Sequence, residues 1–232
     1  MQRYSKIYEK NPREIVLLKS LPCVYGKCTF CNYILDNSLD VNEINAINRE
    51  VIALITGEFG VLEVINSGSV FEIPKPMLDN IKSIADTKNI KTLYFEAYYG
   101  YRKRLPEMCQ FFNQQQIRYR IGIETFDDEF REKVLNKPFP TDNIVELSRE
   151  FYCCMLLICI EGQTRAQILN DINIARTNFK EVIINVFVNN TTKIKRDESL
   201  VEWFIKDIYP NLKDIPNVET LIDNKDLGVF VQ

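Results

Sequence analysis

The segment Leu21-Pro-Cys23-Val-Tyr-Gly-Lys-Cys28-Thr-Phe-Cys31-Asn-Tyr33 separates three cysteines by four and then two residues, directly after an apolar run. Its Pro, Gly and Lys residues favour a loop. Soft thiolates bind zinc, copper(I) or iron–sulfur clusters, and three thiolates on a four-iron cluster leave one iron without a protein ligand. We therefore predict that Cys23, Cys28 and Cys31 are metal ligands. The alternative is that they are small buried apolar side chains, as free cysteines often are.

Strands and helices alternate on both sides of this loop. Short apolar runs predict six strands, at 15–21, 61–66, 92–97, 118–124, 153–160 and 181–188. Helical spacing of apolar residues predicts the connecting helices, with capping boxes at Thr125 to Asp128 and Thr164 to Gln167. Six such units imply a parallel sheet and are too few for a closed eight-stranded barrel. The predicted fold class is α/β, a partial (β/α)6 barrel of parallel strands with helices outside.

The composition is that of one globular domain. The chain has 232 residues, 46% apolar and 26% charged, which is ordinary for such a domain. We expect a single domain over 1–232, with the barrel at about 15–209 and a C-terminal extension, 210–232, folded against the barrel mouth or bottom. Because no apolar run approaches the roughly 20 residues of a membrane helix and the start is polar, we expect a cytoplasmic protein without a membrane partner.

The absence of histidine narrows the possible chemistry. The chain contains no histidine and seven cysteines, which excludes Ser-His-Asp and Cys-His catalysis and histidine-ligated zinc. Without a secretory signal, the odd cysteine count favours reduced thiols and metal binding. The net charge of −3 and pI near 5.3 argue against a large nucleic-acid interface and favour a small-molecule substrate.

The cysteine loop resembles that of the radical S-adenosylmethionine superfamily, which usually has Cys-x3-Cys-x2-Cys with an aromatic residue before the last cysteine. Phe30 holds the aromatic position, and this chain has one extra residue between its first two cysteines. The resemblance implies a [4Fe–4S] cluster on the three cysteines, with S-adenosyl-L-methionine (SAM) on the open iron. An electron donor such as flavodoxin or ferredoxin would drive cleavage of SAM to a 5′-deoxyadenosyl radical, which abstracts a hydrogen atom from the substrate.

The resemblance also assigns cofactor contacts after each strand, where parallel α/β folds bind ligands. Asn32 and Tyr33 follow the last cysteine, where the superfamily contacts adenine. Ser67-Gly68-Ser69 stands in place of a glycine-rich turn that receives the methionine amino group. Gly-Ile-Glu124-Thr is similar to a segment whose Glu contacts ribose or the amino group, and Glu161-Gly162-Gln-Thr to a turn beside adenine. The implied SAM-binding residues are Phe30, Asn32, Tyr33, Ser67, Gly68, Ser69, Glu124 and Gly162.

Three segments resemble one branch of the superfamily: Cys28-Thr-Phe-Cys-Asn-Tyr33, Asn66-Ser-Gly-Ser-Val-Phe71 and Asn185-Val-Phe-Val-Asn189. The branch includes the archaeosine-forming radical lyase, which acts on a 7-deazaguanine in transfer RNA. For a short, histidine-free chain the resemblance implies a free base, queuine, whose C–N bond is cleaved to leave the 7-aminomethyl-7-deazaguanine precursor, and the acidic pI agrees with a free base. Another small metabolite and a 7-deazaguanine bound in transfer RNA remain open as substrates.

Recognition of such a base should need carboxylates and amides. A guanine-like edge presents N1–H and 2-amino donors, which a carboxylate accepts, and amides match its mixed donors and acceptors. The candidate substrate-binding residues are Glu72, Glu96, Glu161, Asn185 and Asn189. Glu96 has the alternative of a salt bridge to a neighbour such as Arg102. No catalytic residue is assigned beyond the cluster and the cofactor.

The main alternative from another class is a structural zinc protein, in which three thiolates and one further ligand close a tetrahedral site. Neither a second Cys-x2-Cys pair nor a histidine supplies that ligand at a recognisable spacing. The remaining cysteines are scattered over predicted helices and strands, so we expect them in the core: Cys109, Cys153, Cys154 and Cys159. The tyrosines at 98, 99 and 101 would either stack on a flat substrate or pack at the barrel rim.

Overall fold

The computed structural model describes residues 2–223 and 225–230, which divide into two compact units. The first unit is formed by the described residues of 1–26, 33–119 and 227–232, and the second by those of 27–32 and 120–226. The cysteine loop therefore contributes Cys23 to the first unit and both Cys28 and Cys31 to the second.

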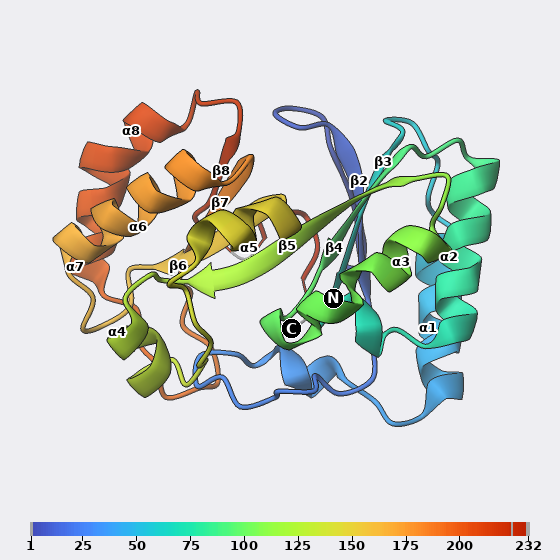
Figure 1. Cartoon of the computed structure of the whole chain (residues 1–232), viewed down its shortest axis with the longest axis horizontal. Helices are drawn as coiled ribbons and strands as arrows, with labels where there is room; N and C mark the ends of the chain where they lie inside the picture. The colour runs from blue at the N-terminus through green and yellow to red at the C-terminus, as the bar shows by residue number, and fades with distance from the viewer. Residues whose placement is uncertain (1, 224, 231–232) are drawn as a thin grey trace. The chain divides into compact units, whose positions relative to one another are not determined.

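The first unit is built on four strands that lie side by side in chain order (Figure 1): β1 (Tyr4–Ile7), β2 (Arg13–Leu18), β3 (Val61–Asn66) and β4 (Thr92–Glu96). β1 is antiparallel to β2, and the other pairs are parallel. Every residue of β2 is buried, as its continuous apolar run predicts. At its start, Arg13 forms a buried ion pair with Glu63 of β3.

Helices connect these strands: α1 (Val41–Ile52), α2 (Lys75–Thr87) and α3 (Leu105–Phe111), with 3-10 turns η1 (Tyr33–Asp36), η2 (Val70–Glu72) and η3 (Tyr99–Arg104). α1 begins at Asp40, whose carboxylate accepts the backbone N–H groups of Asn42 and Glu43, a typical N-cap. α1 packs against β2 and against α2. The turns η2 and η3 follow β3 and β4 directly, so they lie at the carboxyl ends of these strands.

The second unit repeats the same organisation with parallel strands: residues 120–124 of β5 (Gln116–Glu124), β6 (Cys153–Ile158), β7 (Glu181–Val186) and β8 (Val218–Leu221). Its helices are α4 (Asp128–Lys133), α5 (Ile144–Glu150), α6 (Arg165–Asn178), α7 (Glu198–Trp203) and α8 (Tyr209–Leu212), with a π-helical turn η4 (Phe204–Ile208) between the last two. α6 packs on β6 and β7, and α8 packs on β8.

All six predicted strands are present as β2 to β7, with ends within three residues of the prediction. The sequence-based prediction lacks β1 and β8, which are four residues long and carry no continuous apolar run. Both depend on pairing with a longer neighbour, β1 with β2 and β8 with β7. The end of the chain folds back onto the first unit, where Phe230 bridges to Gln2.

The two predicted capping boxes differ in outcome. Thr164 and Gln167 cap each other at the start of α6 as predicted. The prediction for Thr125 is wrong, because the N-cap of α4 is Asp127, whose carboxylate accepts the backbone N–H of Phe130. Thr125 instead accepts the backbone N–H of Asp127 through its hydroxyl. None of the described helices combines the length and apolarity needed to cross a bilayer.

Candidate functional site

In the first unit, the segments after β2 and β3 lie together. The two strands pair in parallel, with Leu18 opposite Asn66, so their carboxyl ends are adjacent. Gly68 lies so close to the cysteine loop that an added Cβ would be 3.3 Å from both Cα and Cβ of Cys23. The glycine is thus needed for a close approach to Cys23 itself.

A buried polar network fixes this turn. The side-chain amide of Asn66 donates to the Ser20 hydroxyl at 3.2 Å and to the Ser69 carbonyl at 3.0 Å. The hydroxyl oxygen of Ser67 lies 3.3 Å from that of Ser20, and the Ser67 hydroxyl donates to the side-chain oxygen of Asn37. Among the described residues, Oδ1 of Asn66 is a buried atom without a hydrogen-bond partner. A ligand N–H would satisfy this acceptor, a role for Asn66 that the sequence motifs do not indicate.

Glu72, at the end of η2, is 5% exposed and contacts the cysteine loop. Its carboxylate accepts the backbone N–H of Val24 at 3.1 Å and the hydroxyl of Tyr101 at 3.0 Å. It also accepts the backbone N–H of Ser69. Burial raises the pKa of Glu72, and these donors oppose the rise. Both oxygens of this predicted substrate carboxylate are therefore occupied by protein donors.

Two of the tyrosines after β4 pack against other aromatic rings. Tyr98 stacks on Tyr25 of the cysteine loop, with centroids 5.6 Å apart, and Tyr101 packs on Phe71 at 4.8 Å. This bears out the packing alternative for these two rings. Glu96, the last residue of β4, is half-buried.

In the second unit, the segment Val134–Lys137 after α4 holds the Cys28 to Cys31 part of the loop. Thr29 donates its backbone N–H to the Leu135 carbonyl at 3.1 Å and its hydroxyl to the Val134 carbonyl at 2.6 Å. Asn136, in the left-handed region with φ 47°, donates its amide to the Lys27 carbonyl at 2.8 Å.

Phe30 is fixed from two sides. The side-chain amide of Asn190 donates to its carbonyl at 2.8 Å. Its ring packs against a buried apolar cluster that includes Phe130, Leu157 and Phe187. The aromatic position before Cys31 thus anchors the loop in the apolar core of this unit.

Glu124 is the last residue of β5 and forms an ion pair with Lys137, which belongs to the segment 134–137 after α4. The two side chains approach to 2.5 Å and are 10% and 14% exposed. Glu124 has φ 66°, a left-handed conformation that is strained for a residue with a side chain. Burial lowers the pKa of Lys137, but the charges of Glu124, Cys28 and Cys31 outweigh it and raise that pKa. A permanent positive charge therefore lies near two of the predicted ligands.

The seven cysteines fall into distinct environments. Cys23, Cys28 and Cys31 are partly exposed and outside any disulfide, whereas Cys153, Cys154 and Cys159 are buried. Burial raises the pKa of Cys159 to about 12 and that of Cys154 well above its usual value, so these core thiols stay protonated. The core prediction is wrong for Cys109, which is exposed because α3 turns Leu105 and Met108 inward instead.

The three partly exposed thiols have the chemistry that an iron–sulfur cluster needs, and the charge of Lys137 lies near Cys28 and Cys31. Over residues 2–223 and 225–230, no group of three or more cysteine, aspartate or glutamate side chains is arranged to hold a metal ion. The assignment of Cys23, Cys28 and Cys31 as ligands stays a prediction.

The other predicted site residues lie in the turns of the second unit and on β7. Gly162, with φ 93°, forms the turn after β6, and Glu161 beside it is exposed. Asn185 donates to the Leu156 carbonyl at 3.2 Å, and Asn189 accepts the backbone N–H of Arg196 at 2.9 Å. Each amide therefore has one protein partner and one polar atom left for a ligand contact. Asn32 is half-buried, and Tyr33, in the first unit, is 47% exposed.

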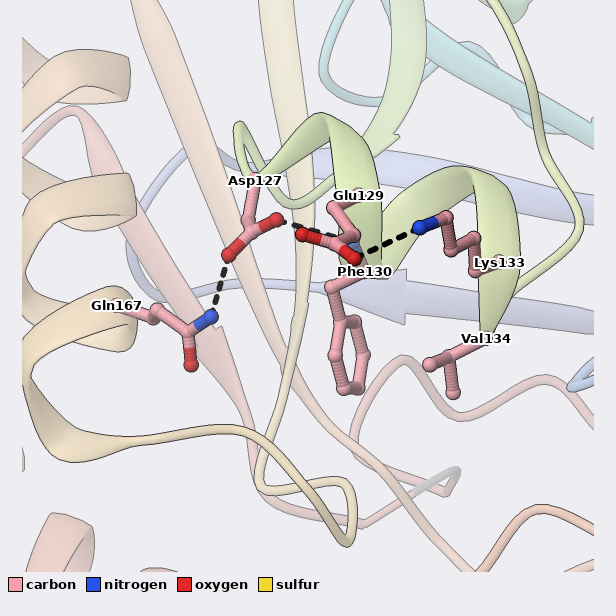
Figure 2. Close-up of a pocket in the computed structure, with 6 residues that line it drawn as sticks. All are labelled: Asp127, Glu129, Phe130, Lys133, Val134 and Gln167. Carbon is pink, nitrogen blue, oxygen red and sulfur yellow. Dashed lines mark hydrogen bonds and ion pairs between the residues drawn. The ribbon is translucent and has the colours of Figure 1, made fainter.

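A surface pocket of about 260 Å³ lies beside α4 (Figure 2), lined by Asp127, Glu129, Phe130, Lys133, Val134 and Gln167. Its polar groups pair with one another, Asp127 with Gln167 and Glu129 with Lys133. None of the predicted site residues lines it. Phe130 of its wall belongs to the apolar cluster against which Val134 and Phe30 both pack.

Known proteins resemble the chain to very different extents. No protein-family model matches it. An uncharacterized protein of Methanocaldococcus jannaschii is 27% identical over 158 residues, which is 59% of this chain and 42% of that relative's length. Streptococcus suis SuiB bound to S-adenosylmethionine has a TM-score of 0.53 and 14% identity over 92% of this chain and 48% of its own. A queuine lyase from Clostridium spiroforme, bound to SAM and queuine, has a TM-score of 0.96 and 47% identity over all of both chains.

These likenesses show the fold of radical S-adenosylmethionine enzymes, the α/β partial barrel that the sequence predicts. With 47% identity over the full length of a solved relative, the chain belongs to the queuine lyase family of that class.

Proposed function

We propose that this chain is a radical SAM lyase that cleaves the C–N bond of free queuine and releases 7-aminomethyl-7-deazaguanine. The observation that carries the proposal is the full-length match to a queuine lyase bound to SAM and queuine. That relative holds the free base, which favours queuine over a 7-deazaguanine within transfer RNA. The acidic pI near 5.3 agrees with a small substrate.

Cys23, Cys28 and Cys31 would hold a [4Fe–4S] cluster, and SAM would bind to its open iron. When bound, this pair supplies a hydrogen-abstracting radical after one-electron reduction by a donor such as flavodoxin or ferredoxin. The chain's own residues position the loop: Gly68 and Glu72 contact the Cys23 part, and Val134–Lys137 contacts the rest.

The cofactor contacts are proposed at the carboxyl ends of the strands. The turn after β3 offers polar backbone and the unpartnered Oδ1 of Asn66 to the methionine amino group. Glu124 contributes a buried carboxylate whose charge is balanced by Lys137. The proposed SAM-binding set is Phe30, Asn32, Tyr33, Ser67, Gly68, Ser69, Glu124 and Gly162.

Among the substrate candidates, the structure supports Glu161 more than Glu72, because the oxygens of Glu72 already accept protein donors. Glu96 is half-buried at the end of β4, and Glu161 is exposed beside the turn of Gly162. Asn185 and Asn189 remain candidates through their second polar atoms. A carboxylate that accepts two donors of a guanine-like edge would fix the orientation of the base.

Anaerobic incubation of the iron-reconstituted, reduced protein with SAM and queuine tests the proposal. We expect 5′-deoxyadenosine and 7-aminomethyl-7-deazaguanine, detected by mass spectrometry. A parallel incubation with transfer RNA that carries a 7-deazaguanine should give no product. Cleavage of SAM with queuine unchanged would reject this substrate. A colourless protein with stoichiometric zinc would support the structural zinc alternative.

A further inference from the structure

Glu72 connects three segments of the first unit that are far apart in sequence. Its carboxylate accepts N–H groups from Val24 and Ser69 and the hydroxyl of Tyr101, and its own backbone carbonyl accepts the N–H of Leu21 at 3.1 Å. The cysteine loop, the turn after β3 and η3 therefore meet at one buried residue.

Cys23 lies between the two loop residues that Glu72 binds. Leu21 is fixed on one side through the Glu72 carbonyl, and Val24 on the other through the carboxylate. Gly68 approaches the same cysteine, and an added Cβ there would lie 2.8 Å from the Glu72 carboxylate as well. Glu72 and the turn together define the backbone position of Cys23.

A carboxylate is chemically suited to this place. Two backbone N–H groups and a phenol point at it, and an ionised carboxylate accepts all three without a donor of its own. A glutamine would keep one accepting oxygen but turn an NH2 group toward another donor. Val24 is 61% exposed and provides no apolar anchor, so its backbone is positioned by the hydrogen bond to Glu72, beside the stacking of Tyr25 on Tyr98.

We propose that Glu72 is a positioning residue for the first cluster ligand: it fixes the backbone around Cys23 and does not read the substrate. The inference rests on the proposed function, because it assumes a cluster on Cys23. Partners that orient metal ligands typically influence metal affinity roughly 10- to 100-fold when they are changed.

The test compares Glu72→Gln with Glu14→Gln, a matched control in the same unit. Glu14 is also buried, and its carboxylate accepts the backbone N–H groups of Thr56 and Gly57 and the hydroxyl of Tyr4. It lies near the start of β2, whereas the cysteine loop follows the end of that strand. Loss of stability alone should therefore be similar in the two variants.

The full chain is reconstituted anaerobically, and its iron content against increasing chelator and the electron paramagnetic resonance spectrum of the reduced cluster are measured. We expect Glu72→Gln to bind iron roughly 10-fold or more weakly and to shift its spectrum toward that of Cys23→Ala, while Glu14→Gln matches the wild type. A Glu72→Gln protein with wild-type iron retention and spectrum would overturn the inference, even if its activity were lower.

If Glu72→Gln does not fold, Tyr101→Phe decides, because it removes one donor and leaves the carboxylate. We then expect weaker iron retention and an altered spectrum in Tyr101→Phe, and unchanged values would overturn the inference. Failure of the wild type to bind any iron would instead reject the proposed function, so the two failures are distinguishable.

Discussion

Substitution of Lys137 by methionine should destabilise the protein strongly before any cofactor is bound. Methionine keeps the length of the side chain but leaves the Glu124 carboxylate, 10% exposed, without the ammonium that lies 2.5 Å away. Removing one partner of a buried ion pair costs roughly 3–5 kcal/mol, and the slight exposure of both groups argues for the lower end. The free energy of unfolding should therefore fall by about 3 kcal/mol.

Urea unfolding of the metal-free protein, followed by circular dichroism, measures this loss. With a slope of at most about 3 kcal/mol per molar, the midpoint should move down by about 1 M or more. The double variant Glu124→Gln/Lys137→Met removes both charges, so we expect it to be more stable than Lys137→Met. The coupling energy between the two sites should be about 1–3 kcal/mol.

Two results would contradict this reasoning. A loss below about 0.5 kcal/mol in Lys137→Met is the size expected of an ordinary surface substitution, and it would mean that solvent screens the pair. Additive effects of the two single substitutions would mean that Glu124 and Lys137 do not stabilise each other, despite their short distance.

Three further predictions concern the loop and the core. Gly68→Ala should destabilise the protein by about 1–3 kcal/mol, because the added Cβ would clash with Cys23. Thermal unfolding measures this loss, and an unchanged melting temperature would mean that the turn moves to accommodate the Cβ. Asn136→Ala should lower the melting temperature more than Asn136→Gly. Both variants lose the hydrogen bond to the Lys27 carbonyl, but only glycine tolerates the φ of 47° without strain. Equal losses would mean that backbone strain at this position is negligible. Burial raises the pKa of Asp171 to about 6, so the wild type should lose stability relative to Asp171→Asn as the pH rises from about 4 to about 6. Parallel pH profiles of unfolding for these two proteins would refute that assignment.

The strands of the fold were predictable where burial alone specifies them. β6 is apolar throughout and β2, β3 and β7 are mostly apolar, and such runs are covered on both faces in a parallel sheet. β1 and β8 have mixed sequences whose extended form depends on a partner strand, which local pattern does not reveal. The cap of α4 was misplaced because Thr125 and Asp127 both have capping side chains, and geometry alone decides between them.

The candidate site was predictable in part. Spacing singled out Cys23, Cys28 and Cys31 as predicted ligands, because ligands supplied by one loop recur at a recognisable spacing. Lys137 and Asn190 lie more than a hundred residues beyond the loop and belong to no motif, so their contacts with it emerge only from the fold. A useful signal for Lys137 was the carboxylate of Glu124, since a buried charge requires a partner nearby in the fold.

The cysteine loop has little that would order it by itself. Val24 is 61% exposed. Gly26 adopts a φ of 58°, and as a glycine it loses more conformational freedom on folding than other residues. The order of the loop therefore comes from contacts with residues outside the loop. Glu72 and the ring of Tyr98 contact the Cys23 part, and residues 134–137 and the apolar cluster around Phe30 contact the Cys28 to Cys31 part. Because a metal site needs its ligands prearranged to bind tightly, the proposed cluster should bind more weakly in variants of these external residues, even with every cysteine intact.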